Sequence, residues 1–206
     1  MKFGDMIKKN MEERDPRLPL LSDKLYSKLF ARCKGLKAAS VLMTSPDKYV
    51  KKVNNASGRF EVIDKEYYSY GADKGEWWYD EIEPQEYYEE YLERDCEYQF
   101  HCWKGKAFWL QLKAPKPHDV ERLLTMDLED IGICVNTKNE YSYDLPIPEL
   151  FSKLREAAEM LAKGLNYVRV DLYIPNNSVF YDIYFSELTF APVAGKINPK
   201  LNIKIG

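Results

Sequence analysis

"VRVDLY" at residues 168–173 and "IYFSELTFAP" at residues 183–192 decide the fold of this chain. Both segments are rich in β-branched and aromatic residues, which predicts two neighbouring strands near the C-terminus. Each strand nevertheless carries one carboxylate, Asp171 in the first and Glu187 in the second, although acidic residues are depleted in strands. The two acids therefore need an explanation other than strand stability.

The alternation of side chains along a strand predicts which residues meet. One face of the second segment is expected to carry Ile183, Phe185, Glu187 and Thr189. If residues 174–182 close a hairpin, four polar side chains converge on one patch: Arg169, Asp171, Glu187 and Thr189. Two carboxylates and a hydroxyl are suitable oxygen ligands for Mg²⁺, which completes its shell with substrate phosphates. The alternative interpretation is that these side chains face solvent, as is common on the outer face of a hairpin.

The composition is that of a soluble globular protein. The chain has 206 residues, 45% hydrophobic and 31% charged, with a net charge of −3, which suits one sizeable core or two small lobes. No segment gathers enough Lys and Arg to bind nucleic acid, no apolar run could span a membrane, and the N-terminus lacks a signal-peptide core. Four cysteines without a CxxC pair suit the cytoplasm, and two histidines argue against a zinc site. We therefore expect a cytoplasmic protein.

The predicted helices and strands do not alternate regularly, which indicates an α+β fold. One helix is expected from an N-cap at Ser22 to a stop at Gly35, with Leu25, Leu29 and Cys33 as its apolar stripe. A second helix is expected over 148–163. Further strands are expected at 40–45, at 48–53, at 97–113 as a pair around the turn "KGK", and at 122–135.

Two stretches upstream of the strand pair suggest a phosphate-binding region. "DKYVKKVNNASGR" at 47–59 is a lysine-bearing strand that runs into a loop of small residues. Glycine and serine allow backbone N–H groups to approach phosphate oxygens, although the loop is not a Walker A motif. "YYEEYLERDCEYQF" at 87–100 follows, with Glu89, Glu90 and Glu97.

Taken together and in this order, these stretches resemble the TupA-like ATP-grasp family, which is associated with teichuronopeptide and other surface-polysaccharide biosynthesis. The similarity begins at "DPRLPLLSDKLYSKLF" (15–30) and extends with gaps to about residue 195. The resemblance implies an ATP-grasp fold with a compressed N-terminal lobe. It divides the chain into a helical segment (1–36) and an ATP-grasp domain (37–206), with a small lobe at 37–92 and a nucleotide and metal lobe at 93–206.

The resemblance also implies an ATP site. The residues that would contact ATP are Lys24 and Lys52 at the phosphates, Asn54, Ser57 and Gly58 in the loop above them, Glu89, Glu90, Tyr91 and Leu92 in the adenine hinge, and Glu97 at the ribose. In the hinge, backbone groups of Glu90 and Leu92 would face the base, with Tyr91 beside it.

The resemblance assigns the catalytic and metal roles to the C-terminal strand pair. Arg169 and Lys52 would act on the transferred phosphoryl group, and Mg²⁺ would be held by Asp171, Glu187 and Thr189. The gap between Asp171 and Glu187 is longer than the family pattern, which leaves Asp182 as a rival second carboxylate.

Three further departures distinguish this chain from the family pattern. Asn55-Ala56 replaces a His-Gly pair in the loop, and Gln99 replaces a lysine. The stretch between the first helix and Lys52 is also short.

The implied function is that of an ATP-dependent carboxylate–amine ligase acting through an acyl phosphate. Its substrates would be a small-molecule or glycan-precursor carboxylate, such as a sugar acid, and an amine such as an amino acid. The alternatives are a nucleotide- or glycan-binding protein with reduced catalysis, or an accessory subunit of a polysaccharide glycosyltransferase pathway. The aromatic run at 66–91 is expected to be core and interface rather than a sugar platform. His101 is expected to be a packed, hydrogen-bonded residue.

Overall fold

The structure is a computed structural model that describes residues 1–42, 49–55, 75–114 and 120–205, and every structural statement below concerns these residues. The α-helices are α1 (Phe3–Glu12), α2 (Leu18–Ser22), α3 (Lys24–Cys33) and α4 (Phe151–Ala162). The short 3-10 helices are η2 (Trp77–Glu81), η3 (Pro192–Gly195) and η4 (Pro199–Leu201).

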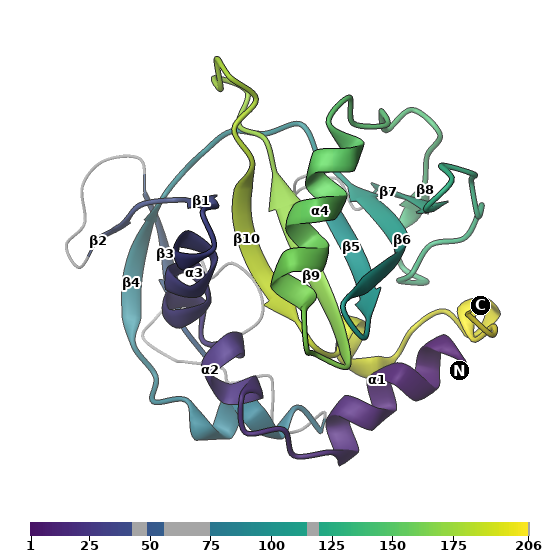
Figure 1. The fold of residues 1–206 in the computed structure, drawn as a ribbon, viewed down its shortest axis with the longest axis horizontal. Coiled ribbons are helices and arrows are strands. Elements are labelled where there is room, and N and C mark those ends of the chain that lie inside the picture. The colour runs from purple at the N-terminus through teal and green to yellow at the C-terminus, as the bar shows by residue number, and fades with distance from the viewer. Residues whose placement is uncertain (43–48, 56–74, 115–119, 206) are drawn as a thin grey trace.

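The strands form two sheets (Figure 1). They are β1 (Lys37–Ala38), β2 (Val41–Leu42), β3 (Tyr49–Val53), β4 (Glu86–Glu90), β5 (Glu97–Trp103), β6 (Lys106–Lys113), β7 (Val120–Thr125), β8 (Glu140–Tyr141), β9 (Tyr167–Tyr173) and β10 (Tyr184–Thr189). The large sheet has the order β1-β10-β9-β5-β6-β7-β8, and the small sheet has the order β2-β4-β3. This mixture confirms the α+β prediction.

The two faces of the large sheet differ in chemistry because its strands alternate apolar and polar side chains. On one face Phe100 lies opposite Val170 and Leu110, and α4 packs there on β9, β5 and β6 through buried residues such as Leu154. The ring of Phe100 stacks on Phe151 with centroids 6.2 Å apart. The other face is polar.

The polar face carries a row of hydrogen-bonding side chains across four strands. Gln99 of β5 lies between Asp171 of β9 and Gln111 of β6, and Gln111 donates to Glu121 of β7 at 2.6 Å. Toward one end of this face, α1 inserts Phe3 edge-on against His101, with ring centroids 5.4 Å apart. The rest of the polar face is free of helical cover from α4 and forms the wall of the site described below.

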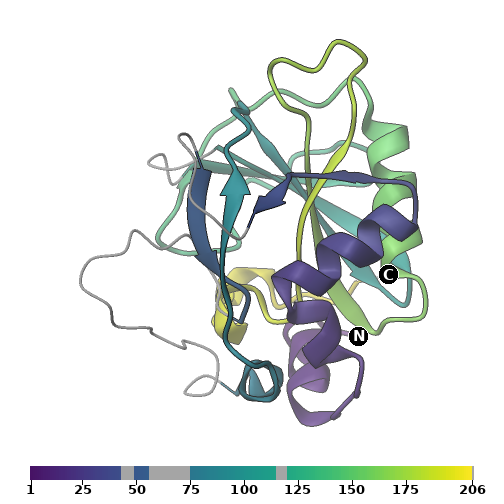
Figure 2. The ribbon, with the colours of Figure 1, turned by 90° about the vertical axis from the view of Figure 1, so that its left-hand side faces the viewer.

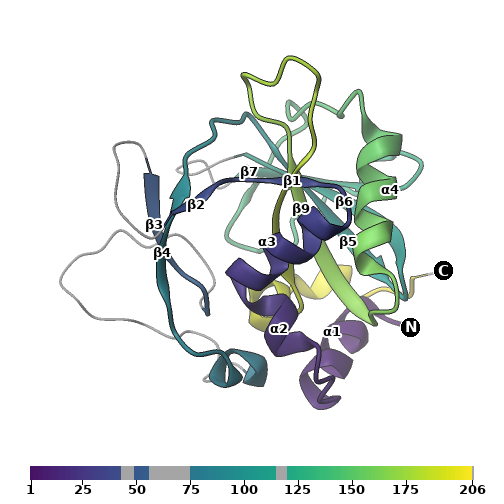
Figure 3. The ribbon, with the colours of Figure 1, turned by 60° about the vertical axis from the view of Figure 1, so that its left-hand side comes forward.

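The small sheet lies beyond the end of the large sheet that carries β1 and β10, on the opposite side of the molecule from α4 (Figures 2 and 3). Helix α3 packs on β10 and β1 and carries side chains that reach both sheets. The small sheet consists of β2, β3 and β4, whereas β1 pairs with β10 and so belongs to the large sheet. The division into lobes at 92/93 stays a prediction.

Helix α3 corrects the prediction for its first residue and its faces, whereas Gly35 at positive φ follows its C-cap, as the predicted stop requires. Its N-cap is Asp23 rather than Ser22, because the Asp23 carboxylate accepts from the backbone N–H groups of Leu25 at 2.7 Å and Tyr26 at 3.1 Å. The predicted apolar stripe is also wrong, since Leu29 is 57% exposed and Cys33 is exposed. The buried face consists of Lys24, Ser27, Lys28 and Ala31.

Two hairpins confirm the strand predictions. The turn between β5 and β6 has Lys104 and Gly105 at positive φ, as a tight hairpin turn requires, and β9 pairs antiparallel with β10. The expected strand at 122–135 is wrong beyond Thr125, because β7 ends there. Helix α4 confirms the helix expected at 148–163, although it begins later, at Phe151, and ends at Ala162. None of the described helices is long and apolar enough to cross a bilayer.

Candidate active site

The site begins at the β9–β10 hairpin, whose register brings its four polar residues together. Asp171 lies opposite Glu187, and Arg169 lies opposite Thr189. The convergence of these side chains on one patch is therefore confirmed. The predicted common face of Phe185 and Glu187 is wrong, because a β-bulge lies between them and Phe185 pairs with Leu172 on the apolar face.

Ser186 is the extra residue of this bulge. A bulge re-aims the side chains that follow it, and here it moves Glu187 onto the face that carries Asp171. The bulge also leaves the Ser186 carbonyl free to accept a hydrogen bond from Lys28 Nζ at 3.2 Å.

Asp171 is 1% exposed and is held by a bidentate contact with Arg169. Arg169 Nε donates to Oδ1 at 2.7 Å, and Arg169 Nη2 donates to Oδ2 at 2.6 Å. Gln99 Nε2 donates to the same Oδ2 at 3.1 Å. Burial raises the pKa of Asp171 to about 7, although the Arg169 charge opposes this shift. Burial alone would lower the pKa of Arg169, but the charge and hydrogen bonds of Asp171, together with the charge of Glu187, raise it, so the guanidinium stays charged.

Glu187 and Thr189 complete a cluster of oxygen atoms. Arg169 Nη2 donates to Thr189 Oγ1 at 3.1 Å and lies 3.6 Å from Glu187 Oε1, while the Thr189 hydroxyl donates to Glu187 Oε1 at 3.4 Å. The Glu187 side chain is 33% exposed. In contrast, Asp182 forms an ion pair with Lys37, so it does not lie with Asp171.

This donor set fits Mg²⁺ only in part. Two carboxylates and a hydroxyl are hard oxygen ligands, but Mg²⁺ takes an octahedral shell. Within the described residues no group of three or more His, Cys, Asp or Glu side chains could hold a metal alone. The cluster therefore suits a metal that shares its shell with ligand phosphates or water.

A second cluster, from α3 and the small sheet, brings positive charge to the site. Glu89 of β4 lies between two lysines, with Lys52 Nζ 2.5 Å from Oε1 and Lys28 Nζ 2.9 Å from Oε2. Burial would raise the pKa of Glu89, but the charges of Lys28 and Lys52 outweigh it and lower the pKa to about 2. Glu89 is therefore a permanent anion that orients both lysines.

Lys24 is the unusual member of this cluster. The residue is 7% exposed, and its ammonium nitrogen is buried without a hydrogen-bond partner. Burial lowers its pKa to about 8, opposed by the charge of Glu187 and reinforced by that of Lys52. A buried ammonium without a partner is costly, so this nitrogen is suited to an anionic ligand such as a phosphate.

Asn54 directly follows β3, the strand that carries Lys52, and connects it to the N-cap of α3. Its side chain donates to Asp23 Oδ2 at 2.9 Å and to the Glu83 carbonyl at 3.1 Å, and accepts from the Gln85 N–H at 2.7 Å. These contacts make its side chain a scaffold for the site rather than a free phosphate ligand. The predicted loop residues Ser57 and Gly58 lie outside the described residues.

The predicted hinge begins in β4 and continues in the connection to β5. The Glu90 N–H donates to the Ser40 carbonyl at 2.9 Å, and the Leu92 carbonyl accepts from Arg94 at 3.2 Å. Tyr91 is 51% exposed. Arg94 also forms an ion pair with Glu97, which fixes the first residue of β5 beside the hinge.

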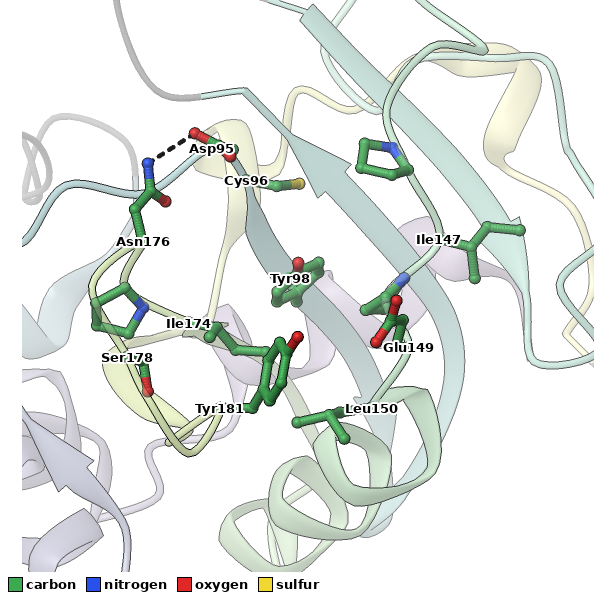
Figure 4. A pocket seen from close by; sticks show the side chains of 13 residues that line it. Asp95, Cys96, Tyr98, Ile147, Glu149, Leu150, Ile174, Asn176, Ser178 and Tyr181 are labelled. Atoms are coloured by element: carbon green, nitrogen blue, oxygen red, sulfur yellow. Dashed lines mark hydrogen bonds between the residues drawn. The ribbon is translucent and has the colours of Figure 1, made fainter.

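Two hollows lined by described residues differ in their chemistry. A cavity of about 510 Å³ is lined by Arg169, Glu187 and Thr189 together with lysines. A hollow of about 420 Å³ lies on the apolar side of β5, where Tyr98, Tyr181 and Leu150 point inward (Figure 4). Its described lining includes acidic residues but no lysine or arginine.

The second hollow is closed at one end by a contact between two loops. Asn176 donates to Asp95 Oδ1 at 2.9 Å (Figure 4), and the Asn176 N–H donates to the Glu93 carbonyl at 2.9 Å. The β9–β10 loop is thereby attached to the segment that follows the hinge.

Sequence reasoning missed Lys28, Arg94 and the role of Gln99. Lys24 and Lys28 are four residues apart, so they lie on one helix face, and this spacing is a signal that could have identified Lys28. His101 is buried and hydrogen-bonded to Tyr167 and Gln111, as expected. In the described part of the aromatic run, Trp78 and Tyr87 are fully buried, which favours the core interpretation for those residues.

Comparisons with known proteins agree with this architecture. A family model described as TupA-like ATPgrasp matches residues 32–202. No curated protein sequence matches the chain. A solved structure of the ATP-grasp ligase PsnB with its minimal precursor is 15% identical with a TM-score of 0.50, over 85% of this chain and 55% of that one. PsnB with minimal precursor, Mg and ADP gives 16% identity and a TM-score of 0.50, over 92% and 57%.

A third match is D-alanine–D-alanine ligase from Bacillus anthracis complexed with ATP, at 19% identity and a TM-score of 0.48, over 83% of this chain and 54% of that one. The chain thus spans a little over half the length of these solved structures. At these identities, the PsnB matches show the shared ATP-grasp fold.

Proposed function

Because the chain belongs to the TupA-like ATP-grasp family, we propose that it is an ATP-dependent carboxylate–amine ligase. The observation that carries this proposal is the buried ammonium of Lys24, which lacks a hydrogen-bond partner and lies within electrostatic reach of Lys52 and Glu187. Such a group suits the phosphates of a nucleotide, between the lysine cluster and the carboxylates of the hairpin.

The proposed ATP lies between the two sheets. Its phosphates contact Lys24 and Lys52, and the family resemblance assigns Ser57 and Gly58 to the same phosphates. Its adenine lies against the hinge, where it uses the Glu90 carbonyl and the Leu92 N–H, since the Glu90 N–H and Leu92 carbonyl are already engaged. The ribose hydroxyls bind Glu97, whose carboxylate Arg94 orients.

Mg²⁺ is assigned to Asp171, Glu187 and Thr189, where it would neutralise negative charge on the phosphates. Both oxygens of Asp171 accept hydrogen bonds from Arg169, and a metal bound to Asp171 would need one of these oxygens. Arg169 must therefore release at least part of this contact, and the transferred phosphoryl group is its new partner in this proposal.

The proposed reaction has two steps. An oxygen of the substrate carboxylate attacks the terminal phosphorus of ATP and ADP leaves, which forms an acyl phosphate. An amine then attacks the acyl carbon, an amide forms, and phosphate leaves with the proton going to solvent or base. Lys24, Lys52 and Arg169 stabilise charge on the moving phosphoryl group. We place the protein in the cytoplasm and its reaction in the biosynthesis of a surface polysaccharide. In this reaction an amino acid is joined to a sugar acid or glycan precursor.

Trapping of the acyl phosphate tests the proposal. The protein is incubated with ATP, Mg²⁺, pools of sugar acids and hydroxylamine, which replaces the natural amine and yields a hydroxamate. We expect ADP and hydroxamate in equal amounts, both dependent on Mg²⁺. Nucleotide binding without either product would support the alternative of a binding protein with reduced catalysis. No binding of nucleotide would overturn the site itself.

A further inference from the structure

The cavity beside Arg169 contains positive charge that the proposed nucleotide does not use. Lys138 and Lys196 both line it, together with Arg169, Glu187 and Thr189. The phosphate lysines of the proposed ATP site do not line this cavity, so Lys138 and Lys196 lie on a different side of the reacting group. Among the described residues neither lysine has an ion-pair partner, and both are exposed.

The two lysine-bearing segments are joined to each other. Lys138 lies in the connection between β7 and β8, and Lys196 follows η3. The Asn198 N–H donates to the Val135 carbonyl at 2.9 Å. This contact brings the two segments to one wall of the cavity, although they are far apart in the sequence.

The turn at residues 136–139, which contains Lys138, is hydrogen-bonded to the buried carboxylate of Glu121. Glu121 is 0% exposed, and it accepts from the Asn136 N–H at 3.2 Å and from Asn139 Nδ2 at 2.7 Å. Gln111 donates to it at 2.6 Å. Burying a carboxylate is expensive unless its oxygens are satisfied, so Glu121 fixes the turn to the sheet.

Within the turn, the backbone is also fixed. The Lys138 N–H donates to Asn136 Oδ1 at 3.0 Å, and the Asn139 N–H donates to the Asn136 carbonyl at 3.1 Å. The backbone that carries Lys138 is therefore held in place, so only the side chain has to be ordered when a ligand binds, which limits the entropy lost.

We propose that Lys138 and Lys196 form an anion subsite for a second acidic group on the carboxylate substrate. The inference rests on the proposed function, and it narrows the substrate class to molecules that carry the reacting carboxylate and a second carboxylate or phosphate. Arg169 and the metal side of the cavity receive the reacting group, and the two lysines receive the other. Glu121 is a positioning residue for this subsite.

Titration calorimetry with matched small acids tests this subsite. The full chain, loaded with Mg²⁺ and a non-hydrolysable ATP analogue, is titrated with pentanoate, glutarate and 3-phosphonopropionate. These probes present one carboxylate, two carboxylates, and a carboxylate with a phosphonate. We expect at least one of the two dianions to bind about tenfold or more tightly than pentanoate, and their order identifies the second group.

Variants show whether the lysines cause this preference. The double variant Lys138→Met, Lys196→Met is expected to bind all three acids equally, with unchanged affinity for the ATP analogue. Lys200→Met is the control, because Lys200 is an exposed lysine that does not line the cavity. Glu121→Gln replaces one of the two accepting oxygens by a donating NH₂ group and is expected to weaken dianion binding without changing the affinity for the ATP analogue.

Two results would overturn the subsite: equal binding of pentanoate and the dianions by the unaltered chain, or a dianion preference that survives the double variant. The titrations are repeated without nucleotide, so the subsite is tested even if the analogue does not bind. Failure of the analogue to bind contradicts the proposed function, whereas loss of dianion preference with normal analogue binding contradicts only this inference.

Discussion

Lys24 shows how a residue can be unfavourable for the free protein and still suit a ligand. Burial disfavours its charged form and lowers its pKa from 10.5 to about 8. The folded state therefore releases this proton more easily than the unfolded state does. The resulting penalty is fully present below pH 8 and is relieved as the pH rises from about 8 to about 10.5.

We predict that Lys24→Met stabilises the free protein and abolishes nucleotide binding. At pH 7 the free energy of unfolding should rise by about 1 to 3 kcal/mol, because a buried charge without a partner is removed. The gain should shrink between pH 8 and 10.5. Urea denaturation over this pH range measures it, with exposed Lys34→Met as the control. A variant that is less stable and still binds ATP would contradict the assignment.

Substitutions of Asp171 and Glu187 should have the same effect on activity but different effects on the free energy of unfolding. We predict that Asp171→Asn and Glu187→Gln each abolish Mg²⁺-dependent ADP formation. Asp171→Asn should also cost about 3 kcal/mol, because it leaves the Arg169 guanidinium buried without its counter-charge. Glu187→Gln should cost less than about 0.5 kcal/mol, since the side chain is one-third exposed.

Asp182→Asn is the matched control for this pair. Asp182 pairs with Lys37 rather than with Asp171, so its loss should leave the metal dependence unchanged. If Asp182→Asn removed the dependence while Glu187→Gln kept it, the second metal ligand would be Asp182.

At the scale of single residues, the convergence of the hairpin side chains was predictable from the two-residue period of a strand. The bulge at Ser186 was not, because nothing in "IYFSELTF" marks which residue is left out of the ladder. The contacts of Glu89 with Lys28 and Lys52 were also unpredictable. They join three elements, and their geometry depends on how α3 packs against the small sheet.

At the scale of elements, α3 shows why the usual amphipathic rule failed. The rule assigns the apolar side of a helix to the core, and Leu25, Leu29 and Cys33 form such a stripe. In the structure the helix turns Lys24 and Lys28 inward instead. The sequence signal for this orientation was the spacing of the two lysines, which places them on one face of the helix. Buried lysines are stable only beside an acidic group or an anionic ligand.

The β9–β10 loop is predicted to support the hinge. Asn176→Ala removes the side-chain bond to Asp95 and keeps the backbone bond to Glu93. One hydrogen bond contributes about 0.5 to 1.5 kcal/mol, so we expect nucleotide affinity to fall by roughly two- to tenfold. Calorimetric titration with ATP measures it.

Asn177→Ala is the control for this variant, because Asn177 is the exposed neighbour in the same loop. An equal loss of affinity in both variants would mean that the loop as a whole, rather than the Asn176 contact, supports the hinge.

At the scale of the whole molecule, the two sheets are joined through buried charges. Lys28 contacts Glu89 of the small sheet at 2.9 Å and the Ser186 carbonyl of the large sheet at 3.2 Å. The small sheet has three described strands, two of them with five residues and one with two. A sheet of this size depends on packing against neighbouring elements, and here the neighbour is α3.

A nucleotide that binds between the sheets should therefore protect one region of the molecule more than others. We predict that Mg²⁺ and a non-hydrolysable ATP analogue slow amide hydrogen exchange in β4, the start of α3 and the β9–β10 hairpin, with little change in α1. At a hundred times the dissociation constant, binding adds about 2.7 kcal/mol to the free energy of unfolding. Lys28→Met should speed exchange in β4 before nucleotide is added, because it removes the contact that bridges the sheets. Protection confined to the large sheet would place the nucleotide elsewhere, since only a ligand held by both sheets can restrain β4 and the hairpin together.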